Sequence, residues 1–262
     1  MRLPQARKTN LILAAVICLL FLVLVGVLFR RQSGKLRNAV ESGNIGQVQQ
    51  ILSESPELIN QAGRHGWTAL HQAANQGQTA VVEQLIEAGA DLNAQTRESS
   101  RHESGWTALH LGASATDAEI VRILLKVGAD PNLSTSRGHT PVHMAAIAGN
   151  VVAIRMLLHV GAPIDPRNDR GHTPLTQAVI ANQAEVVALL VEHGADVNIR
   201  DHQGATPLHF ASRKGFERGV SLLLAGGGDP TIKDQLDETP LTYALAQKHY
   251  RVAELLCGKE TQ

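Results

Sequence analysis

One short motif, repeated six times, constrains this chain more than any other feature of its sequence. Six threonines are each followed by Ala or Pro and then by Leu or Val: Thr68, Thr107, Thr140, Thr173, Thr206 and Thr239. The first interval is 39 residues and the next four are 33 residues each. Local propensity cannot hold such a period, because one helix pair has no information about the length of the next. The chain is therefore predicted to be a stack of copies of one structural unit.

Each copy carries the signals for two short helices. The threonine suits a helix N-cap because its hydroxyl can accept a hydrogen bond from an unpaired backbone N–H of the first turn. Proline follows it in four copies, at the first helical position, where no N–H is needed. Gly or Asn then interrupts the helix, and an apolar run such as residues 81–86 predicts a second helix. Glycines after these runs predict left-handed C-caps, at Gly89, Gly128, Gly161, Gly194 and Gly227.

These motifs resemble the ankyrin repeat, whose pattern begins T-P-L-H and ends G-A-D-x-N. The pattern is matched by residues 68–71 (TALH), 89–93 (GADLN), 140–143 (TPVH), 194–198 (GADVN) and 206–209 (TPLH). The resemblance covers residues 36–262. It implies an all-α repeat solenoid of stacked helix-turn-helix repeats with β-hairpin-like finger loops. About seven repeats are expected, and the first, which lacks the threonine motif, and the last are expected to act as caps.

Histidine stands at the fourth motif position in four copies: His71, His110, His143 and His209. The resemblance implies that these rings hydrogen-bond to the backbone between units, while Thr176 and Thr242 replace histidine in the two other copies. A metal-dependent or hydrolytic enzyme is the alternative, because His139 and His143 have an i, i+4 spacing that can bind zinc. No nucleophile with a base stands outside the repeat pattern. No metal, cofactor, small-molecule substrate or enzyme activity is therefore expected.

Residues 11–29 form an uncharged, proline-free apolar run that predicts a single transmembrane helix. Such a helix spans about 28 Å, enough to cross the hydrocarbon layer. Residues 1–10 would be a short basic tail and residues 30–35 a basic juxtamembrane linker. A cleaved signal peptide and a secreted protein are the alternative, although no small-x-small cleavage site follows the run. Basic residues flank both ends, and the cost of translocating the basic tail favours export of the repeat domain.

The net charge of zero hides an uneven distribution. Residues 1–37 carry seven of the 24 basic residues and no acidic residue, so residues 38–262 have a net charge of −7. Acidic repeats would be repelled by a phosphate backbone, so nucleic-acid binding is not expected. Two cysteines, Cys18 and Cys257, are too few for a disulfide framework. Cys257 is predicted to be buried on the apolar stripe of the last helix.

The expected function is a membrane-anchored scaffold that binds a protein partner in the concave groove of the solenoid. In ankyrin-like repeats the residue before the motif threonine faces that groove, and both tryptophans of the chain occupy this position. Tryptophan is favoured at interface hot spots, although packing on the neighbouring finger is the alternative. Six extra residues within 95–104 predict a long finger that either recognises a partner or is merely solvated. The candidate contact residues are Trp67, Trp106, His139, His172, Arg64, His65, Arg101, His102, Arg137 and Ile147.

Overall fold

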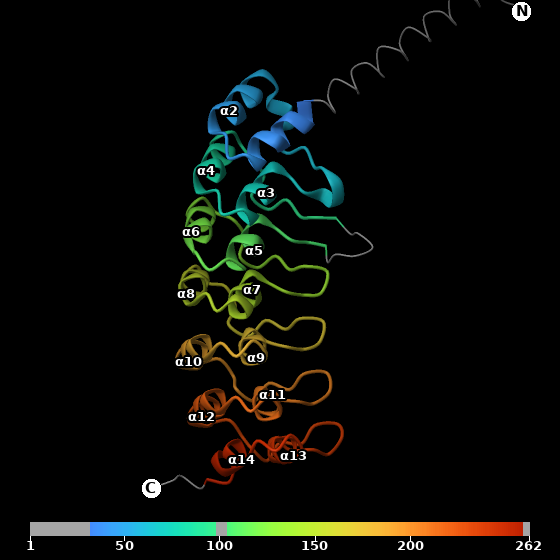
Figure 1. Cartoon of the computed structure of the whole chain (residues 1–262), viewed down its shortest axis with the longest axis vertical. Coiled ribbons are helices and arrows are strands. Elements are labelled where there is room, and N and C mark those ends of the chain that lie inside the picture. The colour runs from blue at the N-terminus through green and yellow to red at the C-terminus, as the bar shows by residue number, and fades with distance from the viewer. Residues whose placement is uncertain (1–31, 98–103, 259–262) are drawn as a thin grey trace, which may run out of the picture.

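A computed structural model describes residues 32–97 and 104–258 of the chain. Two columns of short helices run along the molecule, and loops project from one side of it (Figure 1). A helix over residues 32–41 pairs with α2 (Ile45–Glu54), and six further helix pairs follow in the described residues. The first helices of these pairs are α3 (Ala69–Asn75), α5 (Ala108–Ala113), α7 (Pro141–Ala148), α9 (Pro174–Ile180), α11 (Pro207–Lys214) and α13 (Pro240–Ala246).

The second helices form the other column of Figure 1. They are α4 (Thr79–Glu87), α6 (Glu119–Lys126), α8 (Val151–His159), α10 (Ala184–Glu192), α12 (Glu217–Ala225) and α14 (Tyr250–Leu256). Two short 3-10 helices, η1 (Pro56–Leu58) and η2 (Arg64–Gly66), lie before α3. The all-α solenoid predicted from the repeat period is thus confirmed.

The helix ends follow the sequence signals. All six motif threonines are N-caps with extended backbone, and proline occupies the start of α7, α9, α11 and α13. Gly89 follows α4 with a φ of +86°, a left-handed conformation that a side chain would strain. Asn182 takes the same kind of conformation after α9, with a φ of +58°. Asparagine tolerates this region better than most residues, which is why it can replace glycine there.

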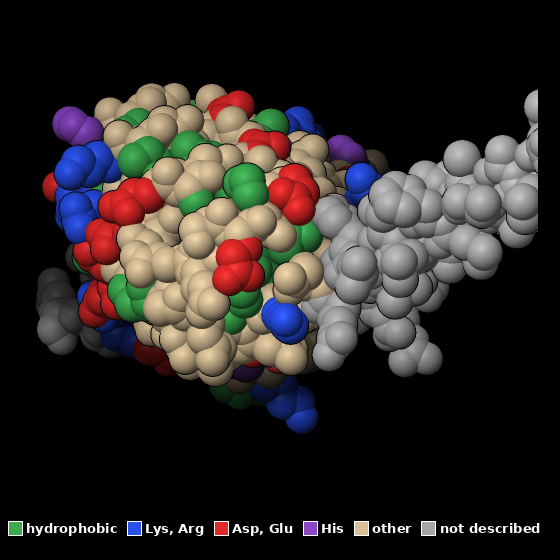
Figure 2. Space-filling model, turned by 90° about the horizontal axis from the view of Figure 1, so that it is seen from above, with side chains coloured by type: hydrophobic (Ala, Val, Ile, Leu, Met, Phe, Trp, Pro, Cys, Tyr) green, Lys and Arg blue, Asp and Glu red, His purple; other side chains and the backbone are tan. Residues whose placement is uncertain are grey.

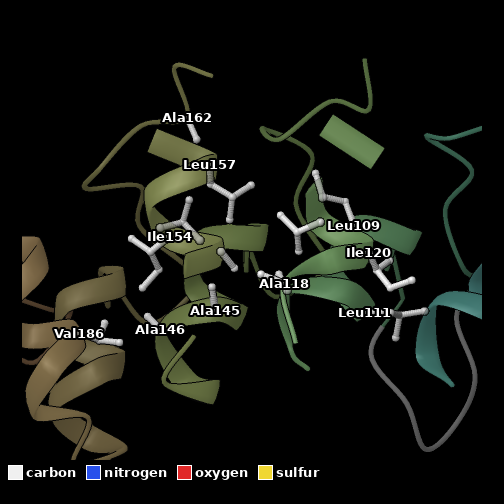
Figure 3. Packing of buried hydrophobic residues seen from close by; sticks show 14 of the residues in the cluster. Leu109, Leu111, Ala118, Ile120, Ala145, Ala146, Ile154, Leu157, Ala162 and Val186 are labelled. Atoms are coloured by element: carbon white, nitrogen blue, oxygen red, sulfur yellow. The ribbon is translucent and has the colours of Figure 1, made fainter. Parts of the chain in front are cut away.

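Apolar side chains between neighbouring helix pairs form one continuous core. Helix α7 packs on α5 and α9, and α8 packs on α6 and α10. Figure 3 shows the buried side chains of successive units, among them Leu109, Ile154 and Leu157, filling the space between the helix pairs. A single pair cannot bury its apolar surface alone, so each unit depends on its neighbours.

The N-terminal repeat presents a mostly polar end to solvent. Seen from above in Figure 2, this end shows few hydrophobic side chains, scattered among polar and acidic ones. At the other end, Leu236, Leu245 and Tyr250 are 75%, 50% and 63% exposed. Cys257 is also exposed, which corrects the prediction of a buried thiol. The reason is that α14 ends at Leu256, so Cys257 is its C-cap and no longer lies within the helix.

The membrane prediction concerns residues that the structure does not describe. No helix within residues 32–97 and 104–258 is long and apolar enough to cross a bilayer. The predicted transmembrane helix at 11–29 and the basic tail at 1–10 lie outside the described residues. Residues 32–35, assigned from the sequence to a linker, are helical and continue directly into the first repeat.

The fingers contain no strand in the described residues, in contrast to the β-hairpin-like loops expected. In the finger before α7, the backbone N–H of Thr135 donates to His139 O at 2.9 Å, and α7 begins at Pro141. The turn therefore passes into the helix before a ladder of strand hydrogen bonds can form.

Candidate partner-binding surface

Hydrogen bonds between neighbouring fingers hold them in a row. The backbone N–H of Arg97 donates to His65 O at 2.7 Å, that of Asp169 to Arg137 O at 2.9 Å, and that of His202 to Arg170 O at 3.0 Å. Each bond joins residues about one repeat apart in the sequence. The finger tips are thus fixed relative to one another by the stacking of the repeats.

The motif histidines join each first helix to the next finger. Nδ1 of His71 accepts from the backbone N–H of Thr68 at 3.2 Å, and Nε2 lies 2.9 Å from Trp106 O. A carbonyl oxygen can only accept, so Nε2 carries the proton, and because Nδ1 accepts a hydrogen bond it is unprotonated and the ring is neutral. His110, His143 and His209 make the equivalent bonds to the carbonyl oxygens of His139, His172 and Glu238. The role expected for these four rings is confirmed.

Burial governs the ionisation of these rings. Removal from water lowers the pKa of His71 and His209, although the carbonyl partner opposes the shift. For His143 burial lowers the pKa to about 4. Both ring nitrogens of each motif histidine are engaged in hydrogen bonds, so no lone pair is left for a metal ion. Within the described residues, no three His, Cys, Asp or Glu side chains are grouped as a metal site would need.

The residues before the motif threonines differ in their exposure. Trp67 and Trp106 are half-buried, and their rings lie 6.1 Å and 6.0 Å from those of His71 and His110. His139 is also half-buried, with Nε2 3.0 Å from Asn168 Nδ2. Both tryptophans therefore pack on the core with one side and face solvent with the other.

His172 does not present its ring to solvent, unlike the other candidates at this position. It is 6% exposed, and its Nε2 lies 3.3 Å from Asp201 Oδ2 in the next finger. Its ring also packs edge-on against Phe210 at 5.2 Å. Burial lowers the pKa of His172, although the Asp201 carboxylate opposes this. His172 therefore joins two fingers and offers no surface for a partner, which corrects its selection as a contact residue.

The remaining candidates occupy the fingers and the tip of one helix. His65 and Arg137 are exposed on the fingers before α3 and α7, and Arg64 begins η2. Ile147 is half-buried near the end of α7. Arg101 and His102 lie outside the described residues, as does most of the inserted finger.

The inner faces of the first helices add residues that were not predicted from the sequence. Four residues after each motif threonine stand Gln72, Leu111, Met144, Gln177, Phe210 and Tyr243. Leu111 and Phe210 are buried, so only the other four, which are half-buried, offer side-chain surface to a partner. The Arg213 guanidinium lies 5.2 Å from the centre of the Phe210 ring. The repeat alignment alone would have found this column, because one register shared by all copies places these side chains on one face.

Trp67 lines a hollow at the N-terminal end of this surface. The hollow has a volume of about 930 Å³ and lies between the helix over residues 32–41, the first finger and α3. Its lining includes Leu36 and Leu58 as well as the polar side chains of Arg37 and Gln72. Apolar and polar groups thus converge beside one of the two tryptophans.

Charge is distributed unevenly between the fingers and the second helices. The fingers, which precede the first helix of each repeat, are rich in arginine. In the second to sixth repeats their described positions hold two aspartates, Asp169 and Asp201, and six arginines: Arg64, Arg97, Arg137, Arg167, Arg170 and Arg200. Helices α4, α6, α8, α10 and α12 hold six glutamates against four basic residues. Five more aspartates lie in the turns that follow these helices: Asp91, Asp130, Asp165, Asp196 and Asp229. The second helices and the turns after them are therefore net negative, and the described finger positions of the second to sixth repeats are net positive.

Comparisons with known proteins agree with this geometry. The family model "Ankyrin repeats (3 copies)" matches residues 36–135, 127–201 and 199–262. The crystal structure of the ankyrin repeat domain of Bcl-3, described as a unique member of the IkappaB protein family, superposes with a TM-score of 0.72. That match is 31% identical and covers 86% of this chain and 98% of that domain.

Curated relatives share only short segments with the chain. The human (Homo sapiens) NAD-capped RNA hydrolase NUDT12 is 45% identical over 49 residues, which are 19% of this chain and 11% of that protein. Mouse (Mus musculus) ankyrin repeat domain-containing protein 40 is 34% identical over 62 residues, 24% of this chain and 17% of that protein. These matches are too short to carry an activity across. Together with the fold and the family model spanning residues 36–262, they show that the chain belongs to the ankyrin repeat family.

Proposed function

We propose that the chain is a membrane-anchored scaffold that binds a protein partner across its fingers and the first helices of its repeats. One observation carries the proposal. Trp67 and Trp106 recur at one position of adjacent repeats, each half-buried on the core and half-open to solvent. Large side chains held rigidly in this way lose little conformational freedom when a partner covers them, which is why such residues dominate binding energy at interfaces.

The membrane anchor rests on the sequence alone. Residues 11–29 supply an apolar segment of sufficient length, and the helix over residues 32–41 starts within a few residues of it. The repeats would then stand close to the membrane surface, with export favoured by the basic N-terminal tail. Reporter fusions after Gln262, one active only outside the cytoplasm and one only inside, test this orientation. Intact mass of the mature chain tests the anchor, because loss of about 30 N-terminal residues would indicate a cleaved signal peptide.

The proposed binding surface, called the groove below, consists of the fingers and first helices around the two tryptophans. It is tested by changing Trp67 and Trp106 together to Ala in the full chain. We expect partner capture to weaken by at least about 2 kcal/mol, because the variant loses two anchors of the interface. Affinity purification from cells, with quantitative mass spectrometry, measures which proteins are lost. Circular dichroism checks that the helical content is kept.

Val152→Glu supplies a matched control for this experiment. Val152 lies on α8 and is 54% exposed, so the change alters a hydrophobic surface position in the other column of helices. A partner that binds the groove is retained by this variant and lost by the tryptophan variant. Equal recovery from both variants would contradict the assignment of the binding surface.

A further inference from the structure

We infer that the partner segment recognised by the fingers is acidic and extended, with a carboxylate at about every third residue. This inference rests on the proposed function and adds the chemistry of the partner. It starts from Arg97, Arg137 and Arg170, which lie exposed on three consecutive fingers. Within the described residues, none of their three guanidinium groups forms a hydrogen bond or ion pair.

Two other finger arginines differ from these three. Nη2 of Arg167 donates to Arg200 O at 2.9 Å, and Nη2 of Arg200 donates to Lys233 O at 2.8 Å. These guanidinium groups join neighbouring fingers and contribute to the stack. The three exposed arginines have no such structural role, and a guanidinium group is suited to two parallel hydrogen bonds with a carboxylate.

The spacing of the arginines indicates which backbone conformation of a peptide ligand would fit them. Packed helices lie about 8–10 Å apart, so Arg137 and Arg170, each three residues before its motif threonine, recur at about that interval. Arg97 lies one register position earlier in its finger, at the position that Ser136 and Asp169 occupy in the next two fingers. A polyproline II segment rises about 3.1 Å per residue with three residues per turn, so every third side chain returns to one face after about 9 Å. In a β-strand, residues three apart point to opposite faces. The polyproline II form therefore matches the finger row, and the strand does not.

The finger of the last repeat is acidic and therefore ends the basic surface. It carries Asp234, Asp237 and Glu238, and its one lysine, Lys233, pairs with Asp237 at 2.9 Å. An acidic ligand would be repelled there, so it should occupy the fingers of the third to fifth repeats. Ile147 and Ile180, near the C-terminal ends of α7 and α9, are half-buried.

An acidic peptide fits this surface better than a nucleic acid. A phosphate backbone brings a charge every few ångströms and gains affinity from many simultaneous contacts. Three arginines on consecutive fingers provide too few contacts for that, and the glutamates of the second helices would repel a large polyanion. A peptide with spaced carboxylates needs only these three positions.

The test uses the full chain in non-ionic detergent and a fluorescein-labelled peptide of four Glu-Pro-Pro triplets. Fluorescence anisotropy measures its affinity for the wild type and for R97Q/R137Q/R170Q. We expect the variant to bind at least tenfold more weakly. A peptide of the same composition with its four glutamates contiguous should bind the wild type at least threefold more weakly than the triplet peptide, because only the triplets match the finger spacing.

The matched control is K126Q/R155Q/R218Q, which removes the same charge from exposed positions of α6, α8 and α12. Its affinity for the triplet peptide should stay within twofold of the wild type. An equal loss in both triple variants, or no binding of the peptide, would overturn the inference. Tighter binding of a twelve-nucleotide thymidine strand, with the same dependence on the finger arginines, would replace the peptide by a nucleic acid.

Failure of this inference is distinguishable from failure of the groove proposal. A cellular partner retained by R97Q/R137Q/R170Q but lost by the tryptophan variant would refute the acidic ligand and keep the groove. A partner retained by both variants would refute both.

Discussion

The histidine of the repeat motif does three things with one ring. It completes the cap of its own helix through Nδ1, joins the next repeat through Nε2, and fills space in the core. Thr176 shows what remains when the ring is absent: its backbone N–H still donates to Thr173 Oγ1 at 3.2 Å. The half of the cap that Thr173 supplies survives this replacement, because it uses the backbone N–H of residue 176, and Thr176 Oγ1 lies 3.1 Å from Thr173 Oγ1. The bond to the following finger needs the longer ring.

His143 should make stability depend on pH. Its pKa is held at about 4 by burial, whereas the unfolded chain binds the proton near the ordinary pKa of 6.5. Between these values the unfolded state binds more protons, so stability is complete above pH 6.5 and falls as the pH decreases toward 4. Compared with pH 7.5, this residue alone should cost about 2 kcal/mol at pH 5. The other buried histidines shift stability in the same direction.

His143→Thr isolates this contribution, because Thr176 occupies the equivalent position in the next repeat. Urea unfolding followed by circular dichroism at pH 5 and pH 7.5 gives the free energy of unfolding of both proteins. The variant should lose about 2 kcal/mol less than the wild type on acidification. Identical pH dependence of the two proteins would show that His143 does not titrate as its burial implies.

At the scale of the element, the finger is the part of the repeat that has no core of its own. Its shape depends on the turn within it and on the finger beside it. Gly105, at the end of the inserted finger, has a φ of +82°, and a Cβ built there would lie 2.9 Å from Thr135 Cα of the next finger. The long finger is therefore seated on its neighbour by a close backbone contact.

Two glycine substitutions separate backbone strain from this contact. Gly128 has a φ of +91° after α6, but a Cβ there would meet no heavy atom of the described residues within 4 Å. Gly128→Ala should cost about 1–2 kcal/mol, the penalty for a side chain in the left-handed region. Gly105→Ala should cost about 1–3 kcal/mol more, because the backbone of the next finger must also move. Equal losses in thermal or urea unfolding would show that the fingers are not closely stacked.

At the scale of the whole molecule, stability is distributed along the stack. In the described part of the chain each helix pair packs chiefly on its two neighbours, so an internal unit has two apolar interfaces and a terminal unit has one. The ends should consequently open more readily than the middle. Backbone hydrogen bonds between neighbouring fingers tie the described fingers into the same stack.

Leu157→Ala and Leu245→Ala compare the inside of this stack with its end. Leu157 is fully buried, and its truncation should cost about 2–5 kcal/mol through lost burial and a cavity. Leu245 is 50% exposed in the last unit, and its truncation should cost less than about 1 kcal/mol. Hydrogen exchange should show faster opening around α7 to α10 only in the first variant. A similar loss for both would contradict a core shared between units.

Much of the architecture could be predicted because its signals are local or repeated. The threonine caps, the initial prolines and the glycine ends act within one helix, and the 33-residue period multiplies each signal. The role of His71 was predictable for the same reason, because the motif recurs. Cys257 and His172 were predicted wrongly because their surroundings depend on where α14 ends and on Asp201, a residue of another finger.

By itself, the sequence determined that the chain is an ankyrin stack with capped helix pairs, an inserted finger and a basic segment beside an apolar run. These properties need only short-range hydrogen bonds and a repeated register. The tertiary structure decided which finger arginines are exposed, which are tied to a neighbouring carbonyl, and which faces carry the opposite charges. Those outcomes depend on contacts between residues about one repeat apart, such as Arg200 with Lys233, which form only when the units stack.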